Sequence, residues 1–236
     1  MSEPIAMPPG LLRRLHHLHQ RVGDLQGQLD RGPKQIAAAQ AIVDKSQAAA
    51  EEAATRVRET TRTADQKQGQ LKSREDGIAA LRGKLNTAAS NKEYSLLEDQ
   101  IAADERANEV LSDEILEVLE KIDTLTERSA AAERKVAEDR EAKDQREAGV
   151  RERLAVVEDD LKGIRASLVE EEAKLPGSIR PIYDRLVAAL GADAMADGDG
   201  GSCGGCHQTL RPMVVDQLKL HRAVQCQGCQ SLLYLD

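Results

Sequence analysis

The chain has almost no aromatic side chains. Of its 236 residues none is Phe or Trp, and the three tyrosines are Tyr94, Tyr183 and Tyr234. Aromatic rings supply much of the buried area of an ordinary globular core, so a wide core is not expected. The apolar residues are instead mostly Ala, Leu, Val and Ile, and 31% of the chain is charged. This composition is typical of long helices and coiled coils.

Long apolar runs are also missing. No stretch approaches the roughly 18 to 20 consecutive apolar residues that a membrane span requires, and residues 1–20 lack the continuous apolar segment of a signal peptide. We therefore expect a cytoplasmic protein with no membrane segment. The cysteines are confined to two pairs near the C-terminus, and in a reducing compartment such pairs favour a metal over a disulfide.

Charge is distributed unevenly. Residues 1–90 carry 14 Lys and Arg against 10 Asp and Glu, whereas residues 91–175 carry 14 against 25. Opposite net charges would favour pairing of two helices, although the same charges would also suit two solvated helices. A basic cluster lies near the N-terminus and would contact either nucleic acid, an acidic partner or the acidic end of the second helix. It comprises Arg13, Arg14, His16, His17, His19 and Arg21.

Apolar residues recur at helical spacing from residue 11 to residue 175. One set of positions seven residues apart is apolar over eight repeats. These are Ile36, Val43, Ala50, Val57, Ala64, Leu71, Ile78 and Leu85. This is the heptad pattern of a coiled coil. Gly32-Pro33 interrupts the helical pattern, and because proline removes a backbone donor, we expect a kink or break near residues 32–33.

The pattern stops again at residues 86–91, where Ser90 and Glu93 have the spacing of a capping box. A turn here folds the chain back and places Ile36 opposite roughly residue 141, since the two helices have similar lengths. A dimer of straight helices would show the same heptads. The fold class that we predict is mostly α, with a long antiparallel coiled-coil hairpin over residues 11–175 after a disordered lead in residues 1–10.

A short helix is predicted over residues 176–191, followed by a zinc ribbon over residues 192–236. Ser178 is the expected N-cap of this helix, and Gly191 is expected to end it with a left-handed backbone. Within the ribbon, residues 212–220 are expected to form one or two helical turns. Residues 223–225 and 232–234 are expected to form short strands.

Four cysteines form two C-x2-C pairs that enclose nineteen residues. They are Cys203, Cys206, Cys226 and Cys229. This spacing is typical of a four-thiolate zinc site, and Gly205 and Gly228 are expected to give each loop its backbone freedom. Four thiolates fill a tetrahedron, so we predict one structural Zn²⁺ and no catalytic one. Iron is a chemically allowed alternative, as are a redox role for a cysteine pair and replacement of one ligand by His207 or His221.

These features resemble the bacterial C4-type zinc-ribbon proteins, in which a coiled-coil hairpin precedes a C-terminal ribbon. The resemblance spans nearly the whole chain and rests on Asn91-Lys92-Glu93-Tyr94, Cys203-Gly204-Gly205-Cys206-His207 and Cys226-x-x-Cys229. It implies that the four cysteines bind zinc and that residues 91–94 lie at the hairpin tip. The sequence departs from the family at Gln230, where a glycine is usual. It also departs at residues 194–198, so we expect the first ribbon strand to be frayed or absent.

The same resemblance implies nucleic-acid binding, or a link to an alternative sigma factor, flagellar biogenesis or type III secretion. The residues favour a non-enzymatic adaptor or chaperone for a protein partner, because the acidic second helix repels phosphate backbones and the sequence shows no catalytic constellation. The alternative is an RNA- or DNA-binding protein acting through the ribbon. A homodimer is compatible with either function. The candidate partner contacts are Asn91, Lys92, Glu93, Tyr94, Arg211, Lys219 and Arg222.

Overall fold

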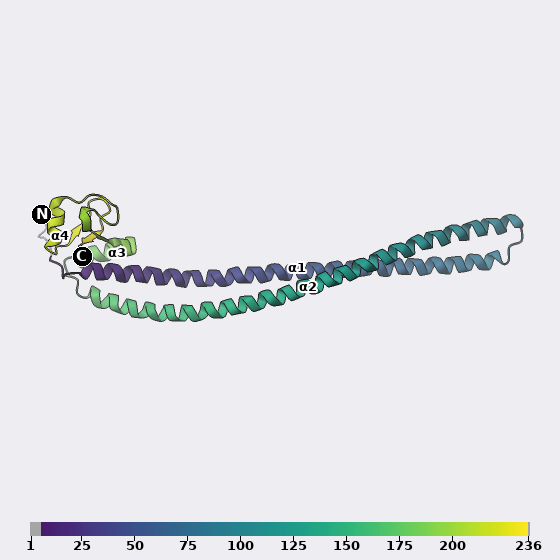
Figure 1. The fold of residues 1–236 in the computed structure, drawn as a ribbon, viewed down its shortest axis with the longest axis horizontal. Helices are drawn as coiled ribbons and strands as arrows, with labels where there is room; N and C mark the ends of the chain where they lie inside the picture. The colour runs from purple at the N-terminus through teal and green to yellow at the C-terminus, as the bar shows by residue number, and fades with distance from the viewer. Residues whose placement is uncertain (1–5, 236) are drawn as a thin grey trace. The chain divides into compact units, whose positions relative to one another are not determined.

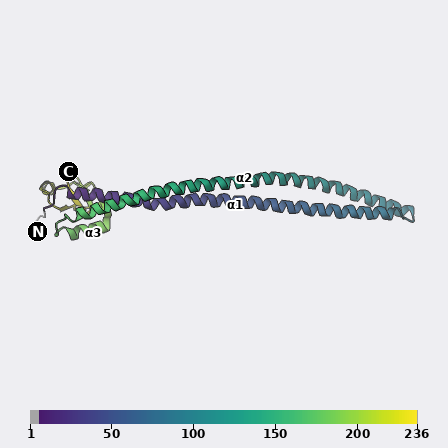
Figure 2. The same ribbon diagram turned by 90° about the horizontal axis from the view of Figure 1, so that it is seen from below.

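The structure is a computed structural model that describes residues 6–235. The chain divides into two compact units. The basal unit comprises the described residues up to Ala37 and from Glu147 onward, and the distal unit comprises Ala38–Arg146. Two long helices, α1 (Leu11–Leu85) and α2 (Asn91–Glu172), pack as an antiparallel hairpin (Figures 1 and 2). The predicted fold class is therefore confirmed. Among the described helices, none is long and apolar enough to cross a membrane.

The heptad positions of α1 form the seam of the hairpin. Each of the eight predicted positions is buried or half-buried, and Ala64 and Ile78 are only 2% and 7% exposed. Ion pairs cross between the helices, each with its cation on α1 and its carboxylate on α2. They are Arg14–Glu171, Lys67–Glu114 and Arg82–Glu105. The basic first half and the acidic second half of the sequence are therefore joined by ion pairs between α1 and α2.

Of the kink or break expected near residues 32–33, the break is wrong, because helix α1 continues through Pro33. Proline removes one backbone hydrogen bond, but the helix is packed against α2 on both sides of it. A Cβ atom on Gly32 would lie 2.5 Å from Leu154 Cδ1, so the glycine lets the two helices approach closely. The expected register is also wrong, because Gln35 contacts Arg153, not a residue near 141.

The turn between the long helices lies where the sequence places it. Helix α1 ends at Leu85 and α2 begins at Asn91. The Glu93 N–H donates to Ser90 Oγ (3.2 Å), which is one half of the predicted capping box. The other half is shifted by one residue, because the Glu93 carboxylate accepts from the Ala89 N–H (3.2 Å).

The segment before α1 is ordered in its described part. Met7 is 8% exposed, its N–H donates to the His221 carbonyl (2.7 Å), and Ala6 pairs with Arg222. The predicted disordered lead is therefore wrong for residues 6–10, because a buried methionine and a backbone bridge hold them. Residues 1–5 lie outside the described residues.

A short helix, α3 (Arg180–Leu190), follows the hairpin. Its N-cap is Ile179 and not the predicted Ser178. Ile179 is only 3% exposed, so burial of this side chain sets the helix start in place of a hydroxyl cap. Gly191 ends the helix with a positive φ of 59°, but its ψ of −126° differs from the left-handed conformation that was predicted.

The C-terminal region contains a three-stranded sheet. Its elements in chain order are η1 (Gly191–Ala194), β1 (Met195–Asp197), η2 (Asp199–Gly201), α4 (Pro212–Lys219), β2 (Val224–Gln225) and β3 (Leu232–Tyr234). The central strand β3 pairs in parallel with β1 and antiparallel with β2. The expectation of a frayed or absent first strand is therefore wrong. Met195 and Ala196 are 1% and 3% exposed, so strand β1 is stabilised by burial on both faces.

The sheet separates two apolar clusters of the basal unit. On one face, Met195 and Leu232 pack with Leu11, Leu15 and Tyr183 from α1 and α3. On the other face, Ala196 and Leu233 pack with Leu218 of α4 and with the buried cysteines. Because side chains alternate along a strand, β1 and β3 each contribute to both clusters.

Candidate metal centre

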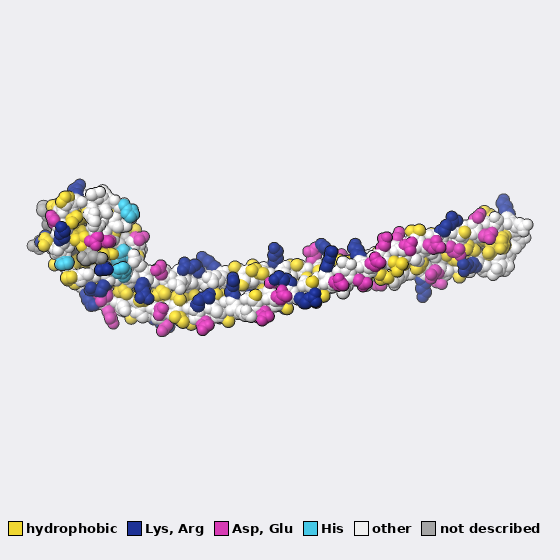
Figure 3. Space-filling view, viewed as in Figure 1, with side chains coloured by type: hydrophobic (Ala, Val, Ile, Leu, Met, Phe, Trp, Pro, Cys, Tyr) yellow, Lys and Arg dark blue, Asp and Glu magenta, His cyan; other side chains and the backbone are white. Residues whose placement is uncertain are grey.

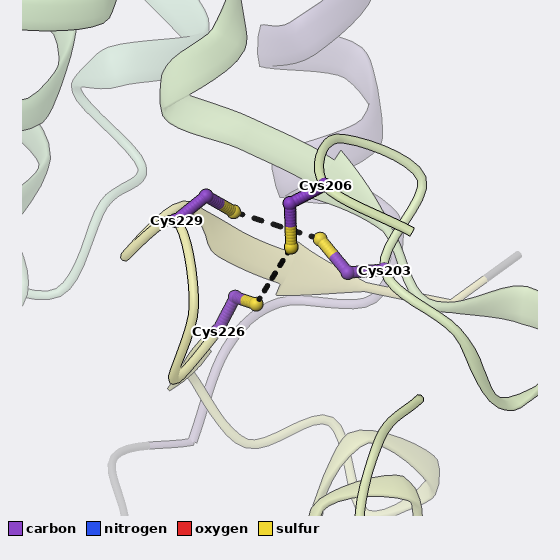
Figure 4. Close-up of side chains that lie close together, drawn as sticks. All are labelled: Cys203, Cys206, Cys226 and Cys229. Atoms are coloured by element: carbon purple, nitrogen blue, oxygen red, sulfur yellow. Dashed lines mark hydrogen bonds between the residues drawn. The ribbon is translucent and has the colours of Figure 1, made fainter. Parts of the chain in front are cut away.

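The four cysteines gather at one point of the basal unit, with their sulfur atoms turned toward one another (Figure 4). All four Sγ atoms lie within 4.8 Å of one another. Cys203 and Cys229 are 3.7 Å apart at sulfur, and Cys206 and Cys226 are 3.6 Å apart. Zn–S bonds of about 2.3 Å in a tetrahedron place the sulfurs about 3.8 Å apart, whereas a disulfide requires about 2.0 Å. The residues present therefore fit a four-coordinate metal ion.

Each cysteine pair is held by a loop of the same construction. The Cys203 carbonyl accepts from the His207 N–H (2.7 Å), and the Cys226 carbonyl accepts from the Gln230 N–H (3.0 Å). His207 and Gln230 both have a left-handed backbone, with φ of 60° and 67°. The backbone of both loops therefore directs the four sulfur atoms to a common point.

The glycines of these loops have a different role from the one predicted. Neither Gly205 nor Gly228 is among the described residues with positive φ, which falls on His207 and Gln230 instead. A Cβ on Gly228 would lie 2.2 Å from Gln208 Oε1 and 3.3 Å from Cys206 Sγ. Gly228 therefore leaves room for the flexible Gln208 side chain and for Cys206 Sγ, and it does not supply an unusual backbone angle.

Replacement of Gln230 by glycine is expected to stabilise the basal unit by about 0.5 kcal/mol. A left-handed backbone costs a side chain about 1 to 2 kcal/mol, and the greater freedom of glycine in the unfolded chain offsets part of this gain. Gln227→Gly is the matched control, since Gln227 is exposed and has no positive φ. Calorimetry should show a higher unfolding temperature for Gln230→Gly and a lower one for Gln227→Gly. Equal destabilisation by both would contradict the strain at Gln230.

Burial and hydrogen bonds act in opposite directions on the thiols. Burial raises the pKa of Cys203 to about 12. Burial also opposes ionisation of Cys229, but its contacts with the Ser231 side chain and backbone N–H outweigh the effect of burial and lower the pKa of Cys229 to about 6. Because a buried thiolate such as that of Cys203 is unfavourable alone, a bound cation is required to keep all four cysteines ionised.

Sequence reasoning missed Ser231, which supports the centre. This residue is 2% exposed. Its Oγ lies 3.3 Å from Cys229 Sγ and donates to the Asp193 carbonyl at 2.7 Å. The signal available in the sequence was a small hydroxyl side chain between the last cysteine and an apolar strand. His207 and His221, the alternative ligands, are exposed and lie outside the described cysteine cluster.

Two histidines of the basic N-terminal cluster bind tyrosines of the basal unit. The Tyr183 hydroxyl donates to Glu172 Oε1 (2.9 Å), so the His19 Nε2–H is assigned as the donor to Tyr183 Oη (2.6 Å). His16 Nδ1 lies 3.0 Å from the hydroxyl of Tyr234. Burial lowers the pKa of both imidazoles, although Glu172 opposes this at His19. These two histidines therefore serve packing, and Arg14 of the same cluster pairs with Glu171 at the acidic end of α2.

The candidate partner contacts fall into two groups. Asn91, Lys92, Glu93 and Tyr94 form the exposed first turn of α2 in the distal unit. Arg211 and Lys219 are exposed at the two ends of α4, whereas Arg222 is half-buried and pairs with Ala6. The exposed candidates therefore lie at the start of α2 and at the two ends of α4.

No family model and no curated protein match the sequence. Solved structures do match it over nearly its full length. CT398 from Chlamydia trachomatis has a TM-score of 0.80 at 15% identity, covering 96% of this chain and 98% of that one. The HP0958 protein from Helicobacter pylori has a TM-score of 0.60 at 15% identity, covering 96% of each chain. A protein from Mycobacterium smegmatis has a TM-score of 0.62 at 18% identity, covering 97% and 99%. The chain therefore shares its fold with these bacterial proteins.

Proposed function

We propose that this protein is a zinc-stabilised, non-enzymatic adaptor or chaperone that binds a protein partner through its distal unit. The observation that carries the proposal is a set of exposed large apolar side chains between residues 94 and 119 of α2, called the apolar set here. Its members are Tyr94, Leu96, Val110, Leu116 and Leu119, which are 37% to 62% exposed. Outward positions of a solvated coiled-coil helix are ordinarily polar or charged. At helical spacing, Tyr94, Leu116 and Leu119 lie along one side of α2, and Leu96 and Val110 lie along the other. Exposed apolar rows of this kind support a surface that a partner covers.

The charges around the apolar set indicate the character of the partner. Helix α2 carries carboxylates throughout this segment, and acidic and hydrophobic side chains are interleaved over the distal helices in Figure 3. Complementary charge sets the orientation and specificity of an interface. The partner is therefore expected to present apolar anchors with a basic rim.

The proposed metal is one structural zinc ion held by Cys203, Cys206, Cys226 and Cys229. An all-thiolate set suits zinc, and the sulfur spacing matches its tetrahedral geometry. Four protein ligands leave no open position for an activated water, which supports a role in folding over catalysis. The resemblance to bacterial C4-type zinc-ribbon proteins supports a place in the regulation of transcription, flagellar assembly or secretion.

Substitution within the apolar set is expected to weaken binding of the protein partner. Leu96→Ser combined with Leu116→Ser should lower recovery in a crosslinked pull-down at least about fivefold, since an interface anchor contributes more than about 1 kcal/mol. Val169→Ser is the matched control, because Val169 is 64% exposed but belongs to the basal unit. Identical recovery with all variants would overturn the proposal. Retention of random RNA that falls steeply with salt would instead favour nucleic-acid binding through the ribbon.

A further inference from the structure

Strand β3 connects the metal centre to the helices of the basal unit. Ser231, directly before β3, contacts Cys229 Sγ at 3.3 Å and donates to the carbonyl of Asp193 in η1. At the other end of the strand, the Tyr234 hydroxyl lies 3.0 Å from His16 Nδ1 of α1. Four consecutive residues thus lead from a metal ligand to α1.

The two residues between Ser231 and Tyr234 belong to different clusters. Leu232 is completely buried in the cluster that contains Leu11, Leu15 and Tyr183. Leu233 is 1% exposed and packs in the cluster that contains Cys203 and Cys226. If β3 became disordered, both clusters would therefore lose packing contacts at the same time, one through Leu232 and the other through Leu233.

We propose that metal binding at the four cysteines controls the order of α3 and of the first two turns of α1. The inference rests on the proposed zinc site. A ribbon that folded independently would lose its structure on chelation and leave the helices intact, but the shared strand makes such independence unfavourable. Coupling between two sites is reciprocal, so damage to the first turns of α1 weakens metal binding in turn. Neither cluster, as described, contains a residue of the distal unit.

Hydrogen exchange of the full chain, before and after chelation of zinc, tests the forward direction. Amides of residues 11–18 and 180–190 should exchange about tenfold faster after chelation, a typical size for coupling between sites. Amides of residues 40–80 should stay within about twofold of their original rates, because they lie outside both clusters. Faster exchange in residues 224–234 alone would overturn the coupling and keep the zinc site. No change in residues 224–234 would overturn the zinc site itself.

Zinc affinity of helix variants, measured by competition with a zinc-binding dye, tests the reverse direction. Leu15→Ala removes a completely buried side chain from the cluster on α1, and Leu111→Ala removes one that is 7% exposed in the distal unit. We expect about tenfold weaker zinc binding for Leu15→Ala and a change within about twofold for Leu111→Ala. If Leu15→Ala does not fold, Tyr234→Phe keeps the ring, removes the hydroxyl that meets His16 and should weaken zinc binding about threefold. Unchanged zinc affinity in Tyr234→Phe and in any folded Leu15→Ala would overturn the inference.

Discussion

Replacement of either Cys206 or Cys226 by serine is expected to abolish chelator-resistant zinc binding. A serine hydroxyl does not ionise near neutral pH, so each variant loses one of four thiolate ligands. Structural zinc sites contribute about 10 to 16 kcal/mol of binding free energy in small domains, and loss of a ligand therefore costs several kcal/mol. Zinc content after dialysis against a chelator, measured by elemental analysis, should fall from one ion per wild-type chain to near zero.

The choice of these two cysteines separates ligation from packing. Cys226 is 2% exposed, whereas Cys206 is exposed. If the cysteines only filled space, Cys226→Ser would be harmful and Cys206→Ser would be tolerated. Equal loss of zinc from both is expected of metal ligands, and Gln227→Ser, between Cys226 and Cys229, should retain the ion. A Cys206→Ser protein that kept its zinc would contradict the four-thiolate site.

Replacement of Tyr183 by alanine is expected to be the most damaging change among residues that do not bind metal. The side chain is 1% exposed and belongs to the apolar cluster shared by α1, α3 and the sheet. Removal of a buried aromatic side chain costs about 3 to 5 kcal/mol. Denaturation with urea, followed by circular dichroism, should show this decrease in the free energy of unfolding of the basal unit.

A second substitution at the same position isolates the hydroxyl. Tyr183→Phe keeps the ring but leaves His19 and Glu172 without their shared hydrogen-bond partner. Both partners are half-buried, so loss of the hydrogen bonds costs about 1 kcal/mol, near the lower end for an unpaired polar group, and this variant should lie between the wild type and Tyr183→Ala. Wild-type stability in Tyr183→Phe would show that Tyr183 acts through its ring alone.

The parts of this structure that follow from local pattern were predictable from the sequence. The heptads of α1, the turn after Leu85 and the helix end at Gly191 each depend on residues close together in the chain. The cysteine cluster was equally predictable, because the geometry of thiolate ligation dictates the C-x2-C spacing. In each case the nearby sequence contains all the information that the prediction needs.

The parts that depend on distant contacts were not predictable. Strand β1 has little strand character of its own and forms because Met195 and Ala196 are buried beside β3. Met7 is ordered by a contact with His221, more than two hundred residues away. The hairpin register brings Gly32 close to Leu154, and folding the sequence back at the turn does not reveal this pairing. Ser231 and the histidine–tyrosine contacts likewise join segments that only the folded chain brings together.

The parallel pairing of β1 with β3 bears on how such proteins evolve. Residues 192–236 look like a portable module in the sequence, but Met195 and Leu232 present an apolar face that α1 and α3 cover. If recombination moved this segment into another gene, one apolar face of its sheet would be exposed to solvent. The ribbon and the ends of the long helices are therefore expected to be inherited as one piece, while insertions or losses of whole heptads in the distal unit leave that piece intact.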